Sequence, residues 1–411
     1  MNSFKSVMPT PPSERIYSLD VLRGVAILGI LIMNIQSFAM IEAAYINPTA
    51  FGDFTGLNKW VWILSHLFAD QKFLSLFSIL FGAGVILITQ RAKIKGYKST
   101  SLYYRRTIWL LIIGLIHAYL FWHGDILVTY ALCGFIVYAF RNLKPNTLVI
   151  VGLIVFSISS LLYLFFGWSM QFWPPEAFDG TMQSWLPNQE IIDKEIAALQ
   201  GTWLQQMAHR VPSSLKFQTF IFLIFTGWRA GGLMLIGMAL YKWRILSAER
   251  SGKFYRIMTI AGLTTGFVLI LIGIKNNFAY NFDFKYSMFI GWQFNYWGSL
   301  FVAMGYIGIA MYFLKRGKNI VLNWFAAIGR TALSNYLLQT IICTLIYYGH
   351  GLGYFGQVDR VSQILIVFGV WIFQIVVTNI WIRYFQFGPV EWLWRSLSYL
   401  KVQPLKNAES V

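Results

Sequence analysis

The chain has little charge, little cysteine and no soluble-enzyme motif. Asp, Glu, Lys and Arg make up 12% of its 411 residues, about half the share found in soluble domains. Its two cysteines, Cys133 and Cys343, lie inside apolar runs, which excludes a disulfide framework and predicts inert core residues. No phosphate-binding loop, zinc-ligand spacing, GxSxG elbow or dinucleotide fingerprint occurs, so the sequence predicts no metal site and none of the enzyme classes that these motifs define.

Apolar residues, in contrast, are abundant. Hydrophobic residues make up 57% of the chain and aromatic residues 18%. Apolar runs of about 20 residues recur along it, and each is long enough to cross a bilayer as a helix. The sequence therefore predicts an all-α fold, a polytopic integral membrane helical bundle of about ten transmembrane helices. The predicted spans are 17–41, 72–90, 107–122, 126–140, 146–167, 215–241, 254–274, 288–314, 331–348 and 361–383.

The basic residues are grouped in alternate short loops. The net charge is +17, but because these residues flank the apolar runs they set topology, and we predict no nucleic-acid partner. The positive-inside rule places both termini in the cytoplasm, so the protein is predicted to be multi-pass in a bacterial cytoplasmic (inner) membrane, with membrane lipid as a partner. The basic residues of these loops are Arg91, Lys93, Lys95, Lys98, Arg105, Arg106, Arg141, Lys144, Lys242, Arg244, Arg250, Lys253, Arg256, Lys315, Arg316 and Lys318.

One membrane domain is predicted over residues 16–396, because no polar linker divides the chain. Residues 1–15 form a cytoplasmic tail without the pattern of a cleavable signal, and residues 397–411 form a second cytoplasmic tail. The segment 167–214 is the one predicted outer piece large enough to form a lid. Two amphipathic, Trp-bearing stretches, 58–68 and 320–328, are predicted to be interfacial helices.

The first span carries a polar face. Asp20, Arg23 and Asn34 share one side of a helix, and the eleven residues from Arg23 to Asn34 span roughly 16 Å. A charge inside an apolar span is costly, so it marks a site, a pathway or a buried ion pair. Arg23 either pairs with Asp20, three residues earlier, or receives an anionic group such as phosphate from the cytoplasm.

A histidine and an aspartate follow in the third span and the turn after it. His117, in GLIHAYLFW, is either a general base or a packing residue bonded to a neighbouring helix. Asp125, in the turn HGD, either orients His117 or caps the next helix.

Further polar groups lie in later spans. Asn335 and Gln339 share a face of the ninth span, and Arg229 is a second intramembrane cation. These three either hold helices together or contact a substrate. Glu391 and Arg395, four residues apart in GPVEWLWR, are predicted to form an interfacial ion pair.

Several of these stretches resemble the YeiB-like bacterial inner-membrane proteins. The stretches are RIYSLDVLRGVAILGILIMNI, KFLSLFSILFGAG, GLIHAYLFWHGDILVTY, GRTALSNYLLQT and GPVEWLWR. The first is also similar to transmembrane acyltransferases, namely the heparan-α-glucosaminide N-acetyltransferase group and the bacterial family that O-acylates envelope sugars. In the latter family the arginine is followed eleven residues later by histidine, whereas here Arg23 is followed by Asn34.

The resemblance implies an integral-membrane acyltransferase that uses acyl-CoA, with acetyl-CoA favoured, as co-substrate. Arg23 and Asp20 would form the donor site, and Asn34 would polarise the thioester carbonyl. His117, which we place here by depth and chemistry, would be the base and Asp125 its orienting partner. The acceptor would be a hydroxyl or amine of a small molecule or envelope glycan.

Two other functions agree with the same residues. A transporter or exporter of a small anionic or amphipathic solute would use Arg23, Arg229, Asn335 and Gln339 to line its path. A non-catalytic membrane partner of an envelope system would need none of these polar groups for activity. The sequence is also compatible with a homo-oligomer.

Overall fold

The computed structural model describes residues 15–94, 96 and 99–406. Most of the two predicted tails (1–14 and 407–411), together with Lys95 and Lys98 of the first basic loop, lie outside the described residues. Within them the regular structure is helical, and the β-type pairing is a single bridge between Phe385 and Lys406. The all-α prediction is therefore confirmed.

All ten predicted spans are helices. Their bounds are α1 (Tyr17–Ala39), α4 (Lys72–Ile94), α5 (Ser99–Leu120), α6 (Leu127–Val137) with η2 (Tyr138–Asn142), α7 (Pro145–Ser169), α10 (Met207–Lys216) continuing through η4 (Phe217–Thr226) into α11 (Gly227–Lys242), α12 (Gly252–Ala279), η5 (Tyr286–Gly291) with α13 (Trp292–Lys315), α15 (Ala332–Tyr347) and α16 (Arg360–Tyr384).

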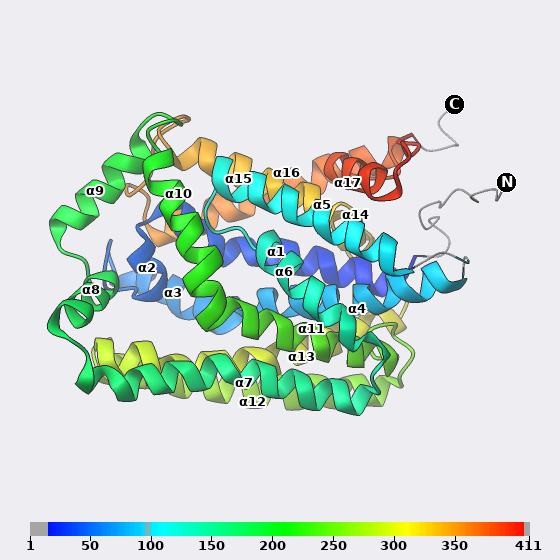
Figure 1. The fold of residues 1–411 in the computed structure, drawn as a ribbon, viewed down its shortest axis with the longest axis horizontal. Helices are drawn as coiled ribbons and strands as arrows, with labels where there is room; N and C mark the ends of the chain where they lie inside the picture. Colours follow the sequence, from blue (N-terminus) through cyan, green and yellow to red (C-terminus); the bar gives the residue numbers. More distant parts are fainter. Residues whose placement is uncertain (1–14, 95, 97–98, 407–411) are drawn as a thin grey trace.

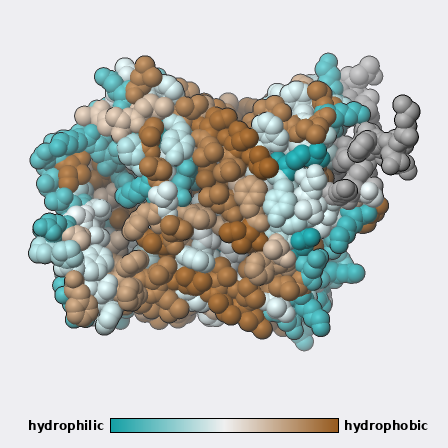
Figure 2. All heavy atoms as spheres, in the orientation of Figure 1, coloured by the Kyte–Doolittle hydropathy of each residue, from teal (hydrophilic) through white to brown (hydrophobic). Residues whose placement is uncertain are grey.

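Seven helical segments of the described chain are long and apolar enough to cross a membrane. The apolar segments containing α6 and α15 are shorter, and α5 carries two arginines next to each other near its start. A hydrophobic band covers the middle of the molecule between two hydrophilic ends (Figure 2). This pattern is that of a polytopic helical membrane protein.

The first helix lies at the centre of the bundle. α1 contacts α4, α13, α15 and α16, and 83% of its apolar 18-residue stretch is buried inside the protein. α7, α12 and α16 lie at the periphery (Figure 1), and only 22–28% of the corresponding apolar stretch of each is buried. Because peripheral apolar helices face lipid, the polar residues of α1 are held inside protein.

Short helices close the two ends. At one end, which we call the cap end, lie α2 (Glu42–Ile46), α3 (Gly56–Phe68), α8 (Pro175–Trp185) and α9 (Gln189–Gln200) (Figure 1). At the opposite end α1 begins, and α17 (Pro389–Tyr399) and α14 (Ile320–Arg330) lie beside it. We call this the basic end, because the basic loops that the sequence predicts to be cytoplasmic lie here. The two predicted interfacial helices correspond to α3 and α14.

The predicted outer segment 167–214 is shorter than expected. α7 continues to Ser169 and is followed by the 3-10 turn η3 (Met170–Phe172), because the aromatic run stays helical until Pro174. At the other side α10 already begins at Met207. The intervening helices pack onto the bundle: Ile192 and Leu199 share a core cluster with Phe38 and Trp122. The segment therefore covers the cap end.

Candidate functional site

Two glycines bring α1 and α14 into backbone contact at the basic end. A Cβ on Gly329 would lie 2.7 Å from the carbonyl carbon of Asp20, and one on Gly24 would lie 2.7 Å from that of Phe325. Both distances are about 1 Å shorter than an ordinary carbon–carbon contact. The crossing places the last residue of α14, Arg330, beside the first turn of α1.

Arg23 does pair with Asp20, as one of the two sequence readings predicts. Its Nη1 lies 3.0 Å from Oδ1 of Asp20. The side chain of Arg23 keeps 28% of its surface exposed, and both residues line a cavity that opens at this end. The ion pair and a role in binding an anion are therefore compatible.

The predicted ion pair between Glu391 and Arg395 is wrong for the described residues. Glu391 instead accepts hydrogen bonds from the backbone amides of Leu333 (2.6 Å) and Ser334 (3.1 Å) and from the Ser334 hydroxyl. It thus caps the start of α15, where free N–H groups and the helix dipole attract a carboxylate. Arg395 forms no salt bridge with a described carboxylate, and its guanidinium lies 4.7 Å from the centre of the Phe387 ring.

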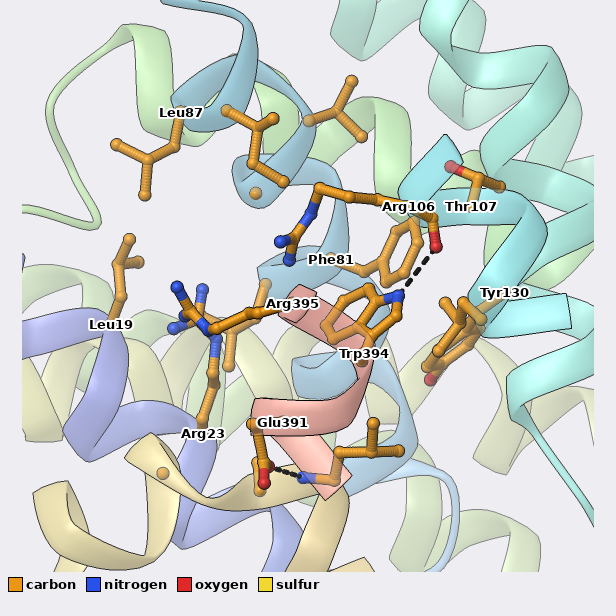
Figure 3. Close-up of a pocket in the computed structure, with 18 of the residues that line it drawn as sticks. Leu19, Arg23, Phe81, Leu87, Arg106, Thr107, Tyr130, Glu391, Trp394 and Arg395 are labelled. Atoms are coloured by element: carbon orange, nitrogen blue, oxygen red, sulfur yellow. Dashed lines mark hydrogen bonds between the residues drawn. The ribbon is translucent and has the colours of Figure 1, made fainter. Parts of the chain in front are cut away.

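Arg106 of α5 reaches the same cavity from the other side. Its guanidinium lies 4.1 Å from the centre of the Trp394 ring, and the indole N–H donates to the Arg106 carbonyl (2.8 Å). The guanidinium groups of Arg23, Arg106 and Arg395 converge from three helices (Figure 3). Stacking on an aromatic ring orients a guanidinium without neutralising it.

The cavity between these helices measures about 280 Å³. Two carboxylates also line it, Asp20 and Glu391. The first pairs with Arg23 and the second caps α15. The arginines that line it are Arg15, Arg23, Arg91, Arg106, Arg330 and Arg395.

The positive charge of the cavity is largely uncompensated. The Nε atoms of Arg106, Arg330 and Arg395 are buried without a hydrogen-bond partner, and none of the three side chains forms a salt bridge within the described residues. Burial, with Arg106 and Arg15 close by, lowers the pKa of Arg395 to about 9. Unpaired buried cations are costly, so this cavity is suited to an anion with several oxygen acceptors.

The inner end of the cavity is aromatic. Phe77, Phe81, Tyr130 and Tyr336 line it. The Tyr336 hydroxyl accepts a hydrogen bond from the Ile126 backbone amide (3.3 Å). The Tyr336 ring lies 5.2 Å from the imidazole of His117.

His117, Asp125 and Thr340 form a buried chain of hydrogen bonds. Nδ1 of His117 lies 2.6 Å from Oδ2 of Asp125, and Nε2 lies 2.9 Å from the Thr340 hydroxyl. Oδ1 of Asp125 accepts from the Val128 backbone amide (2.8 Å) at the start of α6. Asp125 therefore does both things that the sequence left open: it contacts His117 and caps a helix. The three side chains belong to residues that are 1–2% exposed.

Asn34 lies apart from this chain. It is buried in the outer half of α1 and has no side-chain hydrogen bond within the described residues. Phe38, one turn further along α1, stacks on Trp122 at 4.2 Å. The structure thus leaves the Asn34 amide unengaged and does not place it among the residues that line the cavity.

The three predicted substrate contacts are engaged in interhelical bonds. Asn335 bonds to Thr378 of α16, and Gln339 bonds to Gln374 (3.0 Å) and to the Ile27 carbonyl (3.1 Å). Arg229 donates to the hydroxyls of Ser75 (2.7 Å) and Ser299 (2.8 Å) and to two carbonyls, joining α11 to α4 and α13. None of the three lines the cavity.

The sequence reasoning missed most of the cavity and Thr340. Arg106 was assigned to a topology-setting loop and Arg395 to an ion pair, because both lie near helix ends. Thr340 has no sequence signal of its own. A second buried cluster was also missed, in which Asp70 contacts His66 (3.0 Å) and Asn295 (2.7 Å). No group of three or more His, Cys, Asp or Glu side chains that could hold a metal ion occurs in the described chain.

Comparison with known proteins places this arrangement in a family. Residues 240–401 match the family described as "Protein of unknown function (DUF418)". The chain is 34% identical to "Uncharacterized protein YeiB" of Escherichia coli (strain K12), over 95% of this chain and 98% of that protein. The chain belongs to the YeiB-like family.

A second YeiB-like relative is equally similar. "Uncharacterized protein YxaH" of Bacillus subtilis (strain 168) is 34% identical over 99% of this chain and all of that protein. "Uncharacterized 39.9 kDa protein in amylase 3'region" of Bacillus acidopullulyticus is 25% identical over 97% of each chain. Because these matches cover nearly the whole chain, the residues of α1 and α5 at the cavity lie within the region shared with relatives, although the DUF418 match begins only at residue 240.

Proposed function

We propose that this YeiB-like protein is an integral-membrane acyltransferase of the bacterial inner membrane. It moves an acyl group from acyl-CoA to a hydroxyl or amine. The observation that supports this proposal most is the position of the cavity. The cavity begins among six arginines at the basic end and ends at Tyr336, whose ring lies 5.2 Å from the imidazole of His117, the partner of Asp125.

The donor site follows from the charge of the cavity. The positive-inside rule puts the basic end in the cytoplasm, where acyl-CoA is made. The CoA phosphates would bind Arg106, Arg330 and Arg395, because a guanidinium holds a phosphate through paired hydrogen bonds. A volume of about 280 Å³ suits the pantetheine arm and a short acyl chain, with the nucleotide part at the mouth.

The reaction centre follows from the hydrogen bonds of His117. Nδ1 lies 2.6 Å from Oδ2 of Asp125; an ionised carboxylate only accepts, so a neutral imidazole would carry its proton on Nδ1 and could act as a base through Nε2. An acceptor O–H or N–H gives its proton to Nε2 as its oxygen or nitrogen adds to the thioester carbonyl. The C–S bond then breaks, and the CoA thiolate takes a proton from the imidazolium. Asp125 holds the ring in one tautomer.

The acceptor side follows from the cap end. The Trp122 ring lies 6.4 Å from the imidazole of His117, and Trp122 shares a core cluster with Ile192 and Leu199 of α9. A small molecule or an envelope glycan would approach from here. The two substrates would thus reach His117 from opposite faces of the membrane.

Binding of acetyl-CoA tests the donor site. We would measure it by calorimetry on the purified protein and on the variants Arg106→Ala and Arg395→Ala. Each lost charge-assisted contact is worth about 1.5–3 kcal/mol, so we expect affinity to fall about 10- to 100-fold. Arg244→Ala is the matched control, because Arg244 lies in a basic loop with 74% of its side chain exposed.

Two results would contradict this function. The first is no binding of acetyl-CoA by folded wild-type protein. The second is equal affinity in the Arg106→Ala and Arg244→Ala variants. With an acceptor in hand, His117→Gln should bind donor normally and lose turnover.

A transporter of a small anion is the second candidate, since the same arginine cavity would accept one. In that case Arg106→Ala would reduce solute flux into liposomes, and no substrate would be covalently changed. Transport would give the buried hydrogen-bond chain of His117, Asp125 and Thr340 no chemical role, and we therefore favour the acyltransferase.

A further inference from the structure

Thr340 makes an unusual hydrogen bond for a threonine in a membrane helix. Such hydroxyls commonly bond to a carbonyl of their own helix, and here Thr89 and Thr107 do so with the residue four positions earlier (2.8 and 3.0 Å). Thr344, one turn after Thr340, bonds to the Ile341 carbonyl (3.2 Å). The Thr340 hydroxyl instead points away from its helix to Nε2 of His117 (2.9 Å).

The proton positions follow from the other side of the imidazole. The Asp125 carboxylate accepts from Nδ1–H of His117, so Nε2 carries the lone pair. With a neutral imidazole the Thr340 hydroxyl is then the donor, and its proton is directed at the base. A hydroxyl that donates to a histidine, itself oriented by a carboxylate, is the arrangement that activates serine and threonine nucleophiles.

This geometry also bears on where an acceptor can bind. A general base must lie within hydrogen-bond reach of the proton that it removes. At His117 that place is already taken by Thr340, which is 1% exposed. The only hydroxyl that the base can deprotonate without rearrangement is therefore the one on the protein.

We propose that Thr340 is the nucleophile of this protein and carries the acyl group as an ester during transfer. The proposal rests on the acyltransferase function above, and it replaces direct attack of the acceptor on the donor by a transfer in two steps. His117 and Thr340 do not themselves line the cavity, but Tyr336, at its inner end, is one turn before Thr340 on α15. A donor that fills the cavity would therefore end about 5–6 Å along the axis from Thr340.

The step balances within the protein and the donor. Oγ of Thr340 forms a bond to the thioester carbonyl carbon as its proton passes to Nε2 of His117. The C–S bond breaks, and the leaving thiolate takes that proton from His117 to give CoA. The acceptor then attacks the acyl ester, its proton passes to His117, and the Thr340 oxygen recovers a proton as it leaves.

An ester on Thr340 separates the two half-reactions. CoA can leave through the basic end before the acceptor enters from the cap end, so the two substrates need not occupy the site together. The reaction would follow ping-pong kinetics, with a burst of CoA release in the absence of acceptor.

The test uses the full-length purified protein and acetyl-CoA labelled in the acetyl group, without acceptor. Wild-type protein should release about one CoA per protein in a burst and keep the label after denaturation, on the peptide that contains Thr340. Thr340→Val, which keeps the shape of the side chain, should lower labelling by about 10³-fold or more. Thr340→Ser should restore it.

Thr344→Val is the matched control. Thr344 is 3% exposed on the same helix, and among the described residues its hydroxyl bonds to the Ile341 carbonyl of that helix. This variant should label like wild type, whereas a purely structural role for both hydroxyls would make the two valine variants alike. Acetyl-CoA binding measured on the same preparations reports whether each variant is folded.

Three outcomes would overturn the assignment of Thr340. One is wild-type protein that turns over acetyl-CoA without labelling. The second is label on another residue, and the third is a Thr340→Val variant that keeps full turnover. In each of these the acyltransferase function stands and only the nucleophile is wrong. If wild type binds no acetyl-CoA, the proposed function fails, and the role of Thr340 fails with it.

Discussion

The contact between α1 and α14 makes Gly329 a position where a single methyl group should be damaging. In Gly329→Ala the new Cβ would lie 2.7 Å from the Asp20 carbonyl carbon and 2.9 Å from the Gly24 nitrogen. Both atoms belong to the backbone of α1, so no side chain can turn aside. The two helices must separate by at least about 1 Å to restore ordinary contact, because the Asp20 carbonyl oxygen lies closer to this Cβ than the carbonyl carbon does.

The free energy that this separation costs can be estimated from substitutions that overpack a protein core. Inserting a methyl group into a tightly packed core typically costs about 1–3 kcal/mol, and we expect the upper part of this range because backbone must move. Replacing glycine by alanine in a helix otherwise stabilises by up to about 1 kcal/mol. Gly369→Ala in α16 measures that gain, because no atom lies within 4 Å of its new Cβ.

The assay is thermal unfolding in detergent, combined with acetyl-CoA binding. Gly329→Ala should unfold at lower temperature than wild type, and Gly369→Ala at the same temperature or higher. Donor affinity should also fall in Gly329→Ala, since the separation moves Arg330 away from Arg23. If Gly329→Ala were as stable as Gly369→Ala, the close approach of α1 and α14 would be refuted.

Two further predictions concern the ends of the bundle. Glu391→Ala should lower the free energy of unfolding by about 1–3 kcal/mol because it removes the cap of α15. Arg395→Ala should leave the unfolding temperature unchanged or raise it, because it removes an unpaired cation. Equal losses of stability in the two variants would instead indicate that Glu391 and Arg395 form an ion pair. At the cap end, burial raises the pKa of Glu195 from 4.5 to about 7, so the folded state favours the protonated carboxyl. The stability that this protonation contributes is complete below about pH 4.5 and is lost as the pH rises through about 7. Between about pH 4.5 and 7 the unfolding temperature of wild type should therefore fall relative to that of Glu195→Gln. If the unfolding temperatures of the two proteins changed in parallel with pH, the raised pKa of Glu195 would be contradicted.

The polar groups of α1 lie at different depths relative to the cavity. Arg23 and Asp20 lie at the mouth of the cavity, whereas Asn34 lies beyond its inner end. A role for Asn34 in polarising the thioester remains a prediction. Asn34→Leu would test it: a loss of turnover with unchanged donor binding would support that role, and unchanged turnover would exclude it.

The sequence allowed the pairing of His117 with Asp125 to be predicted but not the third member of the chain. Eight residues separate the two, and the short turn HGD brings the end of α5 back to the start of α6. Thr340 is more than two hundred residues further along. Its hydroxyl resembles every other helical threonine until α15 is packed against α5.

For Arg395, in contrast, the prediction from local spacing was wrong. Spacing of four residues favours an ion pair with Glu391 on an isolated helix. In the folded protein the start of α15 offers two backbone N–H groups and a hydroxyl to the same carboxylate. That partner belongs to another helix, so no local pattern could reveal it.

The sequence by itself determined the class of this protein, because hydrophobic run length and the distribution of Lys and Arg act locally and survive any packing. It also determined the family, through motifs that extend along the whole chain. Only the tertiary structure decided which cations share one cavity and which polar groups merely join helices. Those outcomes depend on close approaches such as that of Gly24 to α14, where the distance between two backbones decides whether arginines from α1, α5, α14 and α17 converge.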